Sequence, residues 1–280
     1  MGRLMGHMGP MRPMRPMGLI GLMGLMASCE KDIDIDYHQV EPRYVVEAGL
    51  TTDRTTVRIT TTQAMDDNSN GIGVDGATVV VTSGDSINRK LTYSGKGYYT
   101  SALRGTPGTR YTLTIDVDGH RFTSTSTMQP QPTFNAFRFV WKKVTTERVM
   151  LGDLRIQDIP SSTNYYFLHI YRNNIGYRWA VIADNQRDAT GEIQQLFNCV
   201  SERDQEKGTS GDVLHDGDRI HIEIRAIDRP AYDYLYSMQL MDNTGTNPIS
   251  NFEGGCLGYF TAYNQITYDC IFRADEVEEE

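Results

Sequence analysis

Residues 110–127 read Arg110-Tyr-Thr-Leu-Thr-Ile-Asp-Val117, then Asp118-Gly119, then His120-Arg-Phe-Thr-Ser-Thr-Ser-Thr127. In the first run Leu113, Ile115 and Val117 alternate with polar residues, a period of two that is typical of a strand with one buried face. An Asp-Gly pair between two such runs is a strong signal for a tight hairpin turn. This stretch therefore predicts an antiparallel hairpin.

Similar short runs, rich in Thr and Val, fill the first half of the chain. They cover residues 43–50, 55–62, 77–83, 89–93 and 97–101, in addition to the hairpin strands 110–117 and 120–127. Strands at intervals of about 8–12 residues, with turn residues between them, are typical of a β-sandwich. We therefore expect residues 42–128 to form an immunoglobulin-like β-sandwich.

The segment Gln129-Pro-Gln-Pro132 interrupts this pattern. Closely spaced prolines favour an extended, semi-rigid connection, so residues 129–133 are predicted to link two domains. Residues 134–274 then form a second β-rich domain. Its predicted strands are residues 134–142, 150–157, 165–171, 177–183, 192–197, 219–227, 257–263 and 265–272.

One segment of the second domain reads as a helix. Pro230 suits a first helical turn, and Tyr232, Leu235 and Tyr236 supply an apolar side for a helix over residues 231–242. The strand 219–227 alternates clearly, with isoleucines on one face and charged residues on the other. The fold class that follows is all-β, with two β-sandwich domains, the second carrying one helix.

The first 28 residues have the composition of a secretory signal. An apolar run from Met17 to Met26 follows two arginines and precedes Ala27-Ser28-Cys29. A positive start, a short apolar core and small residues before a cysteine are typical of a bacterial lipoprotein signal peptide, and Cys29 would receive the lipid. The alternative, a transmembrane anchor, needs roughly 20 apolar residues. Met11, Met14 and Met17 are alternative start sites.

Acidic residues follow the cysteine directly, as Glu30-Lys-Asp-Ile-Asp-Ile-Asp36. We expect residues 29–41 to form an acidic tether. Acidic residues at this place resemble the surface-export signal of some diderm bacteria, which predicts a protein anchored in the outer membrane and facing the cell exterior. A solvated tether on the periplasmic side is the alternative. Residues 275–280 form an acidic tail that we expect to fray.

The charge of the chain excludes some partners. The full chain of 280 residues carries a net charge of −9, and the part after residue 28 carries −12, because the signal holds three arginines and no acidic residue. An acidic balance argues against nucleic acid and against electrostatic attachment to anionic lipid. Membrane contact therefore rests on the lipid anchor.

The remaining cysteines are Cys199, Cys256 and Cys270. Outside the cytoplasm a disulfide is permitted, so one pair can form with one thiol left over, and the sequence does not select the pair.

Three stretches carry residues typical of ligand sites, but each departs from the full pattern. Residues 71–76 spell G-x-G-x-x-G but precede a strand, whereas a dinucleotide site needs a helix there. Residues 66–71 begin like a calcium loop, yet Ala77 stands where a glutamate should bind. His215, His221 and Glu223 would need to converge with a further ligand to hold a metal. We therefore predict no cofactor, no metal site and no catalytic residue.

Aromatic residues are frequent in the second half, and Tyr and Trp commonly anchor interfaces. The alternative to such an interface role is that these aromatic side chains fill the cores of the sandwiches. The candidate contact region is the helix 231–242 with the segment 247–263. The candidate ligand or partner contacts are Trp179, Tyr232, Tyr236, Asn247, Tyr259, Phe260 and Tyr263.

Several short motifs resemble those of domain-of-unknown-function family 4249, in order and spacing. They are Tyr44-Val-Val-Glu-Ala48, Asp75-Gly-Ala-Thr-Val-Val-Val81, Asp216-Gly-Asp218, Asn247-Pro-Ile-Ser250 and Leu257-Gly-Tyr-Phe-Thr-Ala-Tyr263. The resemblance covers nearly all of the chain after the signal, least in residues 134–215. It implies an outer-membrane lipoprotein often encoded beside a TonB-dependent transporter. It implies no established activity, so no functional residue is carried over.

The expected function is that of a binding or accessory lipoprotein of a TonB-dependent uptake system, rather than an enzyme. A structural or adhesive surface lipoprotein is the first alternative, and a hydrolase of surface polymers is the second. The ligand, a small molecule or a polymer, is not specified by the sequence.

The sequence predicts that Cys29 anchors the chain. Mass spectrometry of the mature amino end should find an acylated cysteine, and Cys29→Ala should move the protein from the membrane to the soluble fraction. An unmodified Cys29 in a membrane-bound protein would contradict the prediction.

Overall fold

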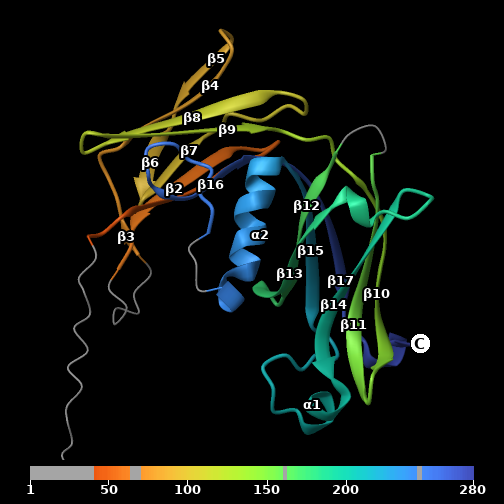
Figure 1. Cartoon of the computed structure of the whole chain (residues 1–280). Helices are drawn as coiled ribbons and strands as arrows, with labels where there is room; N and C mark the ends of the chain where they lie inside the picture. The colour runs from red at the N-terminus through yellow and green to blue at the C-terminus, as the bar shows by residue number, and fades with distance from the viewer. Residues whose placement is uncertain (1–40, 64–70, 160–162, 245–247) are drawn as a thin grey trace, which may run out of the picture. The chain divides into compact units, whose positions relative to one another are not determined.

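The computed structural model describes residues 41–63, 71–159, 163–244 and 248–280 (Figure 1). The signal 1–28, the lipidation site Cys29, nearly all of the tether, Asn247 and the calcium-like segment 66–70 lie outside the described residues. Within the described part the strands form sheets that pack in pairs around separate cores. The predicted all-β fold with two β-sandwiches and a helix is confirmed.

The first sandwich contains the hairpin that the sequence of residues 110–127 predicts. Its strands β8 and β9 pair antiparallel with Val117 opposite His120. Asp118 and Gly119 both have positive φ angles, 48° and 79°, as a tight hairpin turn requires. One sheet has the order β5-β4-β8-β9, made of β4 (Thr78–Ser83), β5 (Ile87–Lys90), β8 (Arg110–Val117) and β9 (His120–Thr127).

The facing sheet has the order β16-β1-β2-β7-β6, with β3 beside β2. Its strands are β1 (Tyr44–Leu50), β2 (Thr55–Thr61), β3 (Ile72–Gly73), β6 (Thr92–Gly95), β7 (Tyr98–Ser101) and β16 (Leu257–Ala262). Alternate residues of both sheets, such as Val46, Val57 and Leu113, are fully buried between them. The predicted strand 89–93 is in fact two strands, because the chain crosses from one sheet to the other at the buried Leu91.

Strand β16 joins the first sandwich although it follows most of the second in the chain. It runs parallel to β1, with Phe260 opposite Ala48, whereas the sequence division placed it in the domain of residues 134–274. The physical reason is burial: Phe252, Cys256 and Phe260 fill the first core. Across the sandwich, the Ala262 N–H donates to Ser126 Oγ of β9 at 2.8 Å.

The second sandwich has sheets ordered β14-β11-β10-β18 and β13-β12-β15-β17. The strands are β10 (Thr133–Val144), β11 (Glu147–Gln157), β12 (Tyr165–Arg172), β13 (Ile175–Ala183), β14 (Glu192–Ser201), β15 (Arg219–Ile227), β17 (Asn264–Ile271) and β18 (Glu278–Glu279). On β15 the residues Ile220, Ile222 and Ile224 are buried in the core, as the alternation predicted.

Helix α2 (Arg229–Thr244) covers part of the outer face of the sheet that contains β12 and β13 (Figure 1). Its Ala231, Tyr234 and Leu235 pack on Phe167 and other residues of that face. Asp228 precedes the helix and accepts hydrogen bonds from the Ala231 N–H at 3.3 Å and from the Thr127 N–H at 2.8 Å. One carboxylate therefore caps the helix and ties it to the end of β9.

A short helix, α1 (Glu202–Lys207), was not predicted. Ser201 caps it by accepting from the Asp204 N–H, and Gly208 ends it at φ 64°. In the described part of the chain, no helix combines the length and apolar character that a membrane span requires. Among the described residues, Cys199, Cys256 and Cys270 are free thiols, so the disulfide that the sequence permits is not formed.

The acidic tail 275–280 does not fray as expected, because basic side chains hold it. Glu278 and Glu279 form β18, which pairs parallel with β10. Arg138 bonds to Glu278 and, at 2.7 Å, to Glu280, while Arg148 bonds to Glu279. Opposite charges contributed by β10 and β11 thus offset the repulsion within the tail.

Gly258 is required where β16 meets β1. It has φ +99°, and a Cβ atom there would lie 1.9 Å from the Val46 carbonyl oxygen. Gly255 has a similar φ of +89° with open space around it. We expect Gly258→Ala to cost about 3 kcal/mol or more in the free energy of unfolding, and Gly255→Ala about 1–2 kcal/mol from backbone strain alone. Urea unfolding measures both, and equal losses would contradict this account of β16.

Candidate functional site

A cleft of about 380 Å³ lies between two surfaces: the outer face of the sheet β16-β1-β2-β7-β6 and the outer face of the paired strands β15 and β17. The register of β16, β1, β2 and β7 places Tyr259, Glu47, Arg58 and Tyr98 in one cross-strand row. The neighbouring positions Val46, Ala48, Val57 and Ile59 point into the core, so this row points outward. The other wall is formed by Glu223, Arg225 and Gln265.

Tyr263 lies at the base of the cleft, where the chain passes from β16 to β17. Its N–H donates to the Leu50 carbonyl at 2.9 Å. Its ring lies over Gly49, since a Cβ atom on Gly49 would be 3.3 Å from Tyr263 Cε1. The absence of a side chain at Gly49 therefore lets the ring reach the sheet surface.

Arg225 stands between two aromatic rings. Its guanidinium carbon is 5.3 Å from the Phe167 ring centre and 5.0 Å from the Tyr263 ring centre. It also forms an ion pair with Glu223, and these side chains are only 18% and 17% exposed. Burial lowers the pKa of Arg225, but Tyr263 and Glu223 outweigh it and raise the pKa above its usual value. Arg225 is a fixed cation in this wall.

Tyr259 forms part of the opposite wall and is held by stacking. Its ring lies 4.6 Å from that of Tyr234 on α2, at an interplanar angle of 17°. Burial raises the pKa of Tyr259 to about 12, although Arg225 opposes the shift. The phenol is therefore neutral at physiological pH and keeps both a donor and an acceptor.

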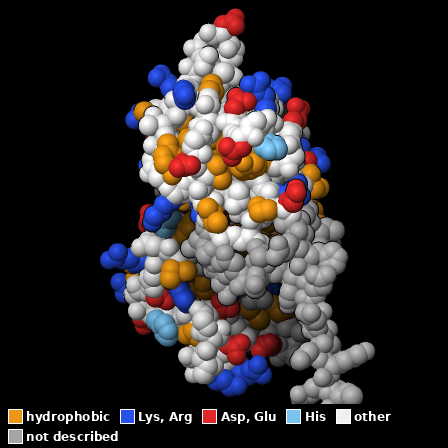
Figure 2. Space-filling view, turned by 90° about the vertical axis from the view of Figure 1, so that its left-hand side faces the viewer, with side chains coloured by type: hydrophobic (Ala, Val, Ile, Leu, Met, Phe, Trp, Pro, Cys, Tyr) orange, Lys and Arg blue, Asp and Glu red, His pale blue; other side chains and the backbone are white. Residues whose placement is uncertain are grey.

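The charges of the cleft are balanced. Its carboxylates are Glu47, Asp53 and Glu223, and its guanidinium groups are Arg54, Arg58 and Arg225. Glu47 and Arg58 form an ion pair at 3.6 Å across β1 and β2. Acidic and basic side chains are also interspersed over the face in Figure 2 rather than segregated. The site therefore presents dipolar pairs and no net field of one sign.

Two buried polar atoms at the cleft lack a hydrogen-bond partner within the described residues. They are Arg225 Nε and Thr261 Oγ1. Thr261 is only 4% exposed and lies on β16 between Tyr259 and Tyr263. Buried polar groups are normally paired, and an unpaired one costs about 1–3 kcal/mol. The walls of the cleft therefore contain polar atoms without the hydrogen bonds that a protein core normally provides.

The metal-like group on β15 does not converge. His221 and Glu223 share the outer face, as expected, but His221 Nδ1 lies 2.7 Å from Asp269 and its Nε2 lies 3.6 Å from Glu223. His215 is exposed in the preceding turn. Within the residues that the structure describes, no group of three His, Cys, Asp or Glu side chains is arranged to hold a metal ion.

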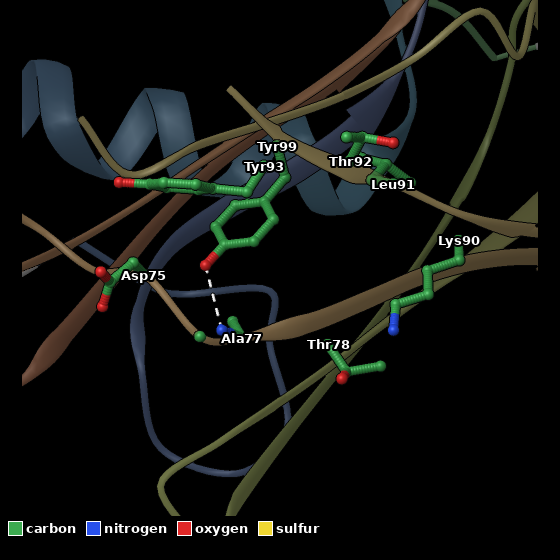
Figure 3. A pocket seen from close by; sticks show the side chains of 9 residues that line it. Asp75, Ala77, Thr78, Lys90, Leu91, Thr92, Tyr93 and Tyr99 are labelled. Atoms are coloured by element: carbon green, nitrogen blue, oxygen red, sulfur yellow. Dashed lines mark hydrogen bonds between the residues drawn. The ribbon is translucent and has the colours of Figure 1, made fainter. Parts of the chain in front are cut away.

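A second cavity, of about 640 Å³, opens in the first sandwich where the chain crosses between sheets (Figure 3). The Tyr99 hydroxyl accepts from the Ala77 N–H at 3.0 Å and donates to the Val74 carbonyl at 3.1 Å. Its central polar group is thus already satisfied by the protein. Gly71 and Gly76 have positive φ angles and precede β4 rather than a helix, so they form turns and not a dinucleotide site.

The predicted contact residues fall in different places. Tyr259 and Tyr263 line the cleft. Tyr232 and Tyr236 stack on each other on α2, at 5.5 Å, and Trp179 lies on β13 against Phe167 at 6.0 Å. The prediction that Phe260 contacts a ligand or partner is wrong. Its side chain is 0% exposed in the first core, because its neighbours on β16 take the outward positions. Asn247 lies outside the described residues.

The sequence interpretation missed the polar residues of the cleft. Glu223 and Arg225 were placed only on the charged face of the strand 219–227, and Gly49, Arg58 and Thr261 were not singled out. For Glu223 and Arg225 the one signal was the alternation of β15, which shows that a side chain points outward but not that another strand covers it.

Comparison with known proteins gives one family. The family model described as "Domain of unknown function (DUF4249)" matches residues 30–269. No curated protein matches the chain. Among solved structures, a match is found to a segment of two fibronectin type-III domains from chicken tenascin. The match covers 82% of this chain and 99% of the tenascin chain, with 10% identity and a TM-score of 0.23. A likeness at this level carries no argument about function.

The stack of Arg225 on Tyr263 should be measurable. In a double-mutant cycle with Arg225→Met and Tyr263→Leu, we expect a coupling of about 1–2 kcal/mol in the free energy of unfolding, because the cation is largely desolvated. The pair of Arg229 and Tyr165, at 5.7 Å, in which the arginine is 64% exposed, is the control and should couple more weakly. Equal coupling in the two cycles would show that burial does not strengthen the stack.

Proposed function

The chain belongs to the DUF4249 family, and from that premise we propose that it is a lipid-anchored lipoprotein of the outer membrane that binds ligand for a TonB-dependent uptake system. The run from Met17 to Cys29 supports the anchor, because it has the order of a lipoprotein signal. The acidic residues that follow support display on the cell surface. The family resemblance supports a transporter partner.

The observation that carries the binding role is the cleft between the sheets. It combines aromatic walls, paired charges and two buried polar atoms without a partner. Binding sites are typically concave, with a few polar groups that fix orientation. A purely adhesive or structural protein needs no such cleft. The hydrolase alternative is less supported, because two of the three carboxylates of the cleft, Glu47 and Glu223, are each paired with an arginine.

Helix α2 is the candidate surface for the transporter. Tyr165, Tyr232 and Tyr236 form a row of ring contacts that leads from the sheet onto the helix. Tyr236 is 44% exposed and Met241 39%. Exposed tyrosines with rings already held by neighbours lose little conformational freedom on binding, and such residues often dominate interface energy.

The partner proposal is tested by co-purification. The full-length lipoprotein should be recovered with an outer-membrane barrel protein after mild detergent extraction and cross-linking. Tyr236→Glu should reduce recovery of the barrel at least about tenfold, since it places a charge in the interface core. Tyr93→Glu, the same substitution at an exposed tyrosine of β6 outside the helix, is the matched control.

Point substitutions are needed here because truncation would remove β16 from the first sheet. Recovery of the wild-type lipoprotein without any barrel would contradict the transporter partnership. Equal loss with Tyr236→Glu and Tyr93→Glu would contradict the role of the helix surface.

A further inference from the structure

We propose that the cleft binds a neutral, polyhydroxylated ligand, namely a short segment of an oligosaccharide. The proposal rests on the binding role above and names the ligand class of that same site. It is argued from the paired charges, the composition of the walls and the rigidity of the cleft.

The paired charges favour hydroxyl groups over ions. Glu47 lies beside Arg58, and Glu223 lies beside Arg225, so two of the three guanidinium groups of the cleft already have a carboxylate. An anionic ligand would meet these carboxylates as well as the arginines. A hydroxyl group both donates and accepts hydrogen bonds, and adjacent hydroxyls of a sugar match the two oxygens of a carboxylate and the forked N–H groups of arginine.

The walls contain almost no aliphatic surface. Apart from Ala48 and Gly49, the lining side chains are tyrosines, threonines and charged or amide groups. A lipid or an aliphatic side chain would therefore leave polar groups desolvated without partners, at a cost. Tyr98 is 38% exposed at the edge of the cleft, with Arg58 5.5 Å from its ring centre. The apolar C–H face of a sugar ring can pack on such a ring while its hydroxyls reach the polar row.

The cleft is preorganised. Tyr259 is stacked on Tyr234, and Tyr263 is held between Gly49 and Arg225. Side chains that are already fixed lose little entropy when a ligand binds, which improves affinity. The volume of about 380 Å³ lies within the range of small-ligand sites, roughly 300–1,000 Å³. Because the cleft is open to solvent, it suits a segment of a longer chain.

Isothermal titration calorimetry of the full-length lipoprotein in detergent, without a transporter, tests the proposal. The probes are maltotriose, cellotriose, xylotriose and mannotriose, with the dipeptide alanyl-alanine and inorganic phosphate as the zwitterionic and anionic comparisons. We expect saturable binding of at least one trisaccharide and none of the two comparison probes.

Variants then place the binding in the cleft. Glu47→Gln and Tyr98→Ala should each weaken trisaccharide binding at least about tenfold. Both positions are exposed, so the fold should survive, and circular dichroism and thermal unfolding check this. The matched controls are Glu147→Gln on β11 and Tyr93→Ala at the cavity of Figure 3, which should change affinity less than about twofold.

Other outcomes overturn the proposal. Binding of no trisaccharide, or tighter binding of alanyl-alanine with loss in Glu47→Gln, would refute the ligand class. Sugar binding that Tyr93→Ala abolishes and Tyr98→Ala leaves intact would refute the location. The co-purification experiment is independent of these titrations, so a missing transporter would refute the partnership and leave the assigned ligand class standing.

Discussion

The parallel pairing of β16 with β1 is the contact on which the rest of the structure depends. It brings a strand from the end of the chain into the first sheet and fills the first core with Phe260. The chain then passes through Tyr263 directly into β17 of the second sandwich. The two sandwiches are therefore joined by three covalent connections: residues 129–132, the segment between β15 and β16, and Tyr263.

The cleft follows from this pairing. Since β16 is part of one sandwich and β17 of the other, Tyr259 and Thr261 face the same space as Gln265. Arg225 can then lie between Phe167 of its own sheet and Tyr263 of the connection. A guanidinium group tolerates this position because the rings and Glu223 replace the water that it loses.

Local patterns were enough to predict most strands. The hairpin of residues 110–127 and the alternation of β15 are set by nearest neighbours and by a period of two, so the sequence carries them directly. The helix was placed within two residues at each end. The division of strand 89–93 was missed because the chain crosses between two sheets at Leu91. The ordered structure of the acidic tail 275–280 was missed because the arginines that bind it, Arg138 and Arg148, lie far away in the sequence.

The sequence by itself determined the all-β class and the alternation of buried and outward side chains along strands such as β8 and β15. Only the tertiary structure decided which outward-facing residues are covered. Phe260 is buried in the first core, and Arg225, which was expected only on the charged face of its strand, lies in an aromatic stack. The physical reason is that strand pairing over long sequence separations is selected by burial of whole faces, and a period of two says nothing about which face another sheet will cover.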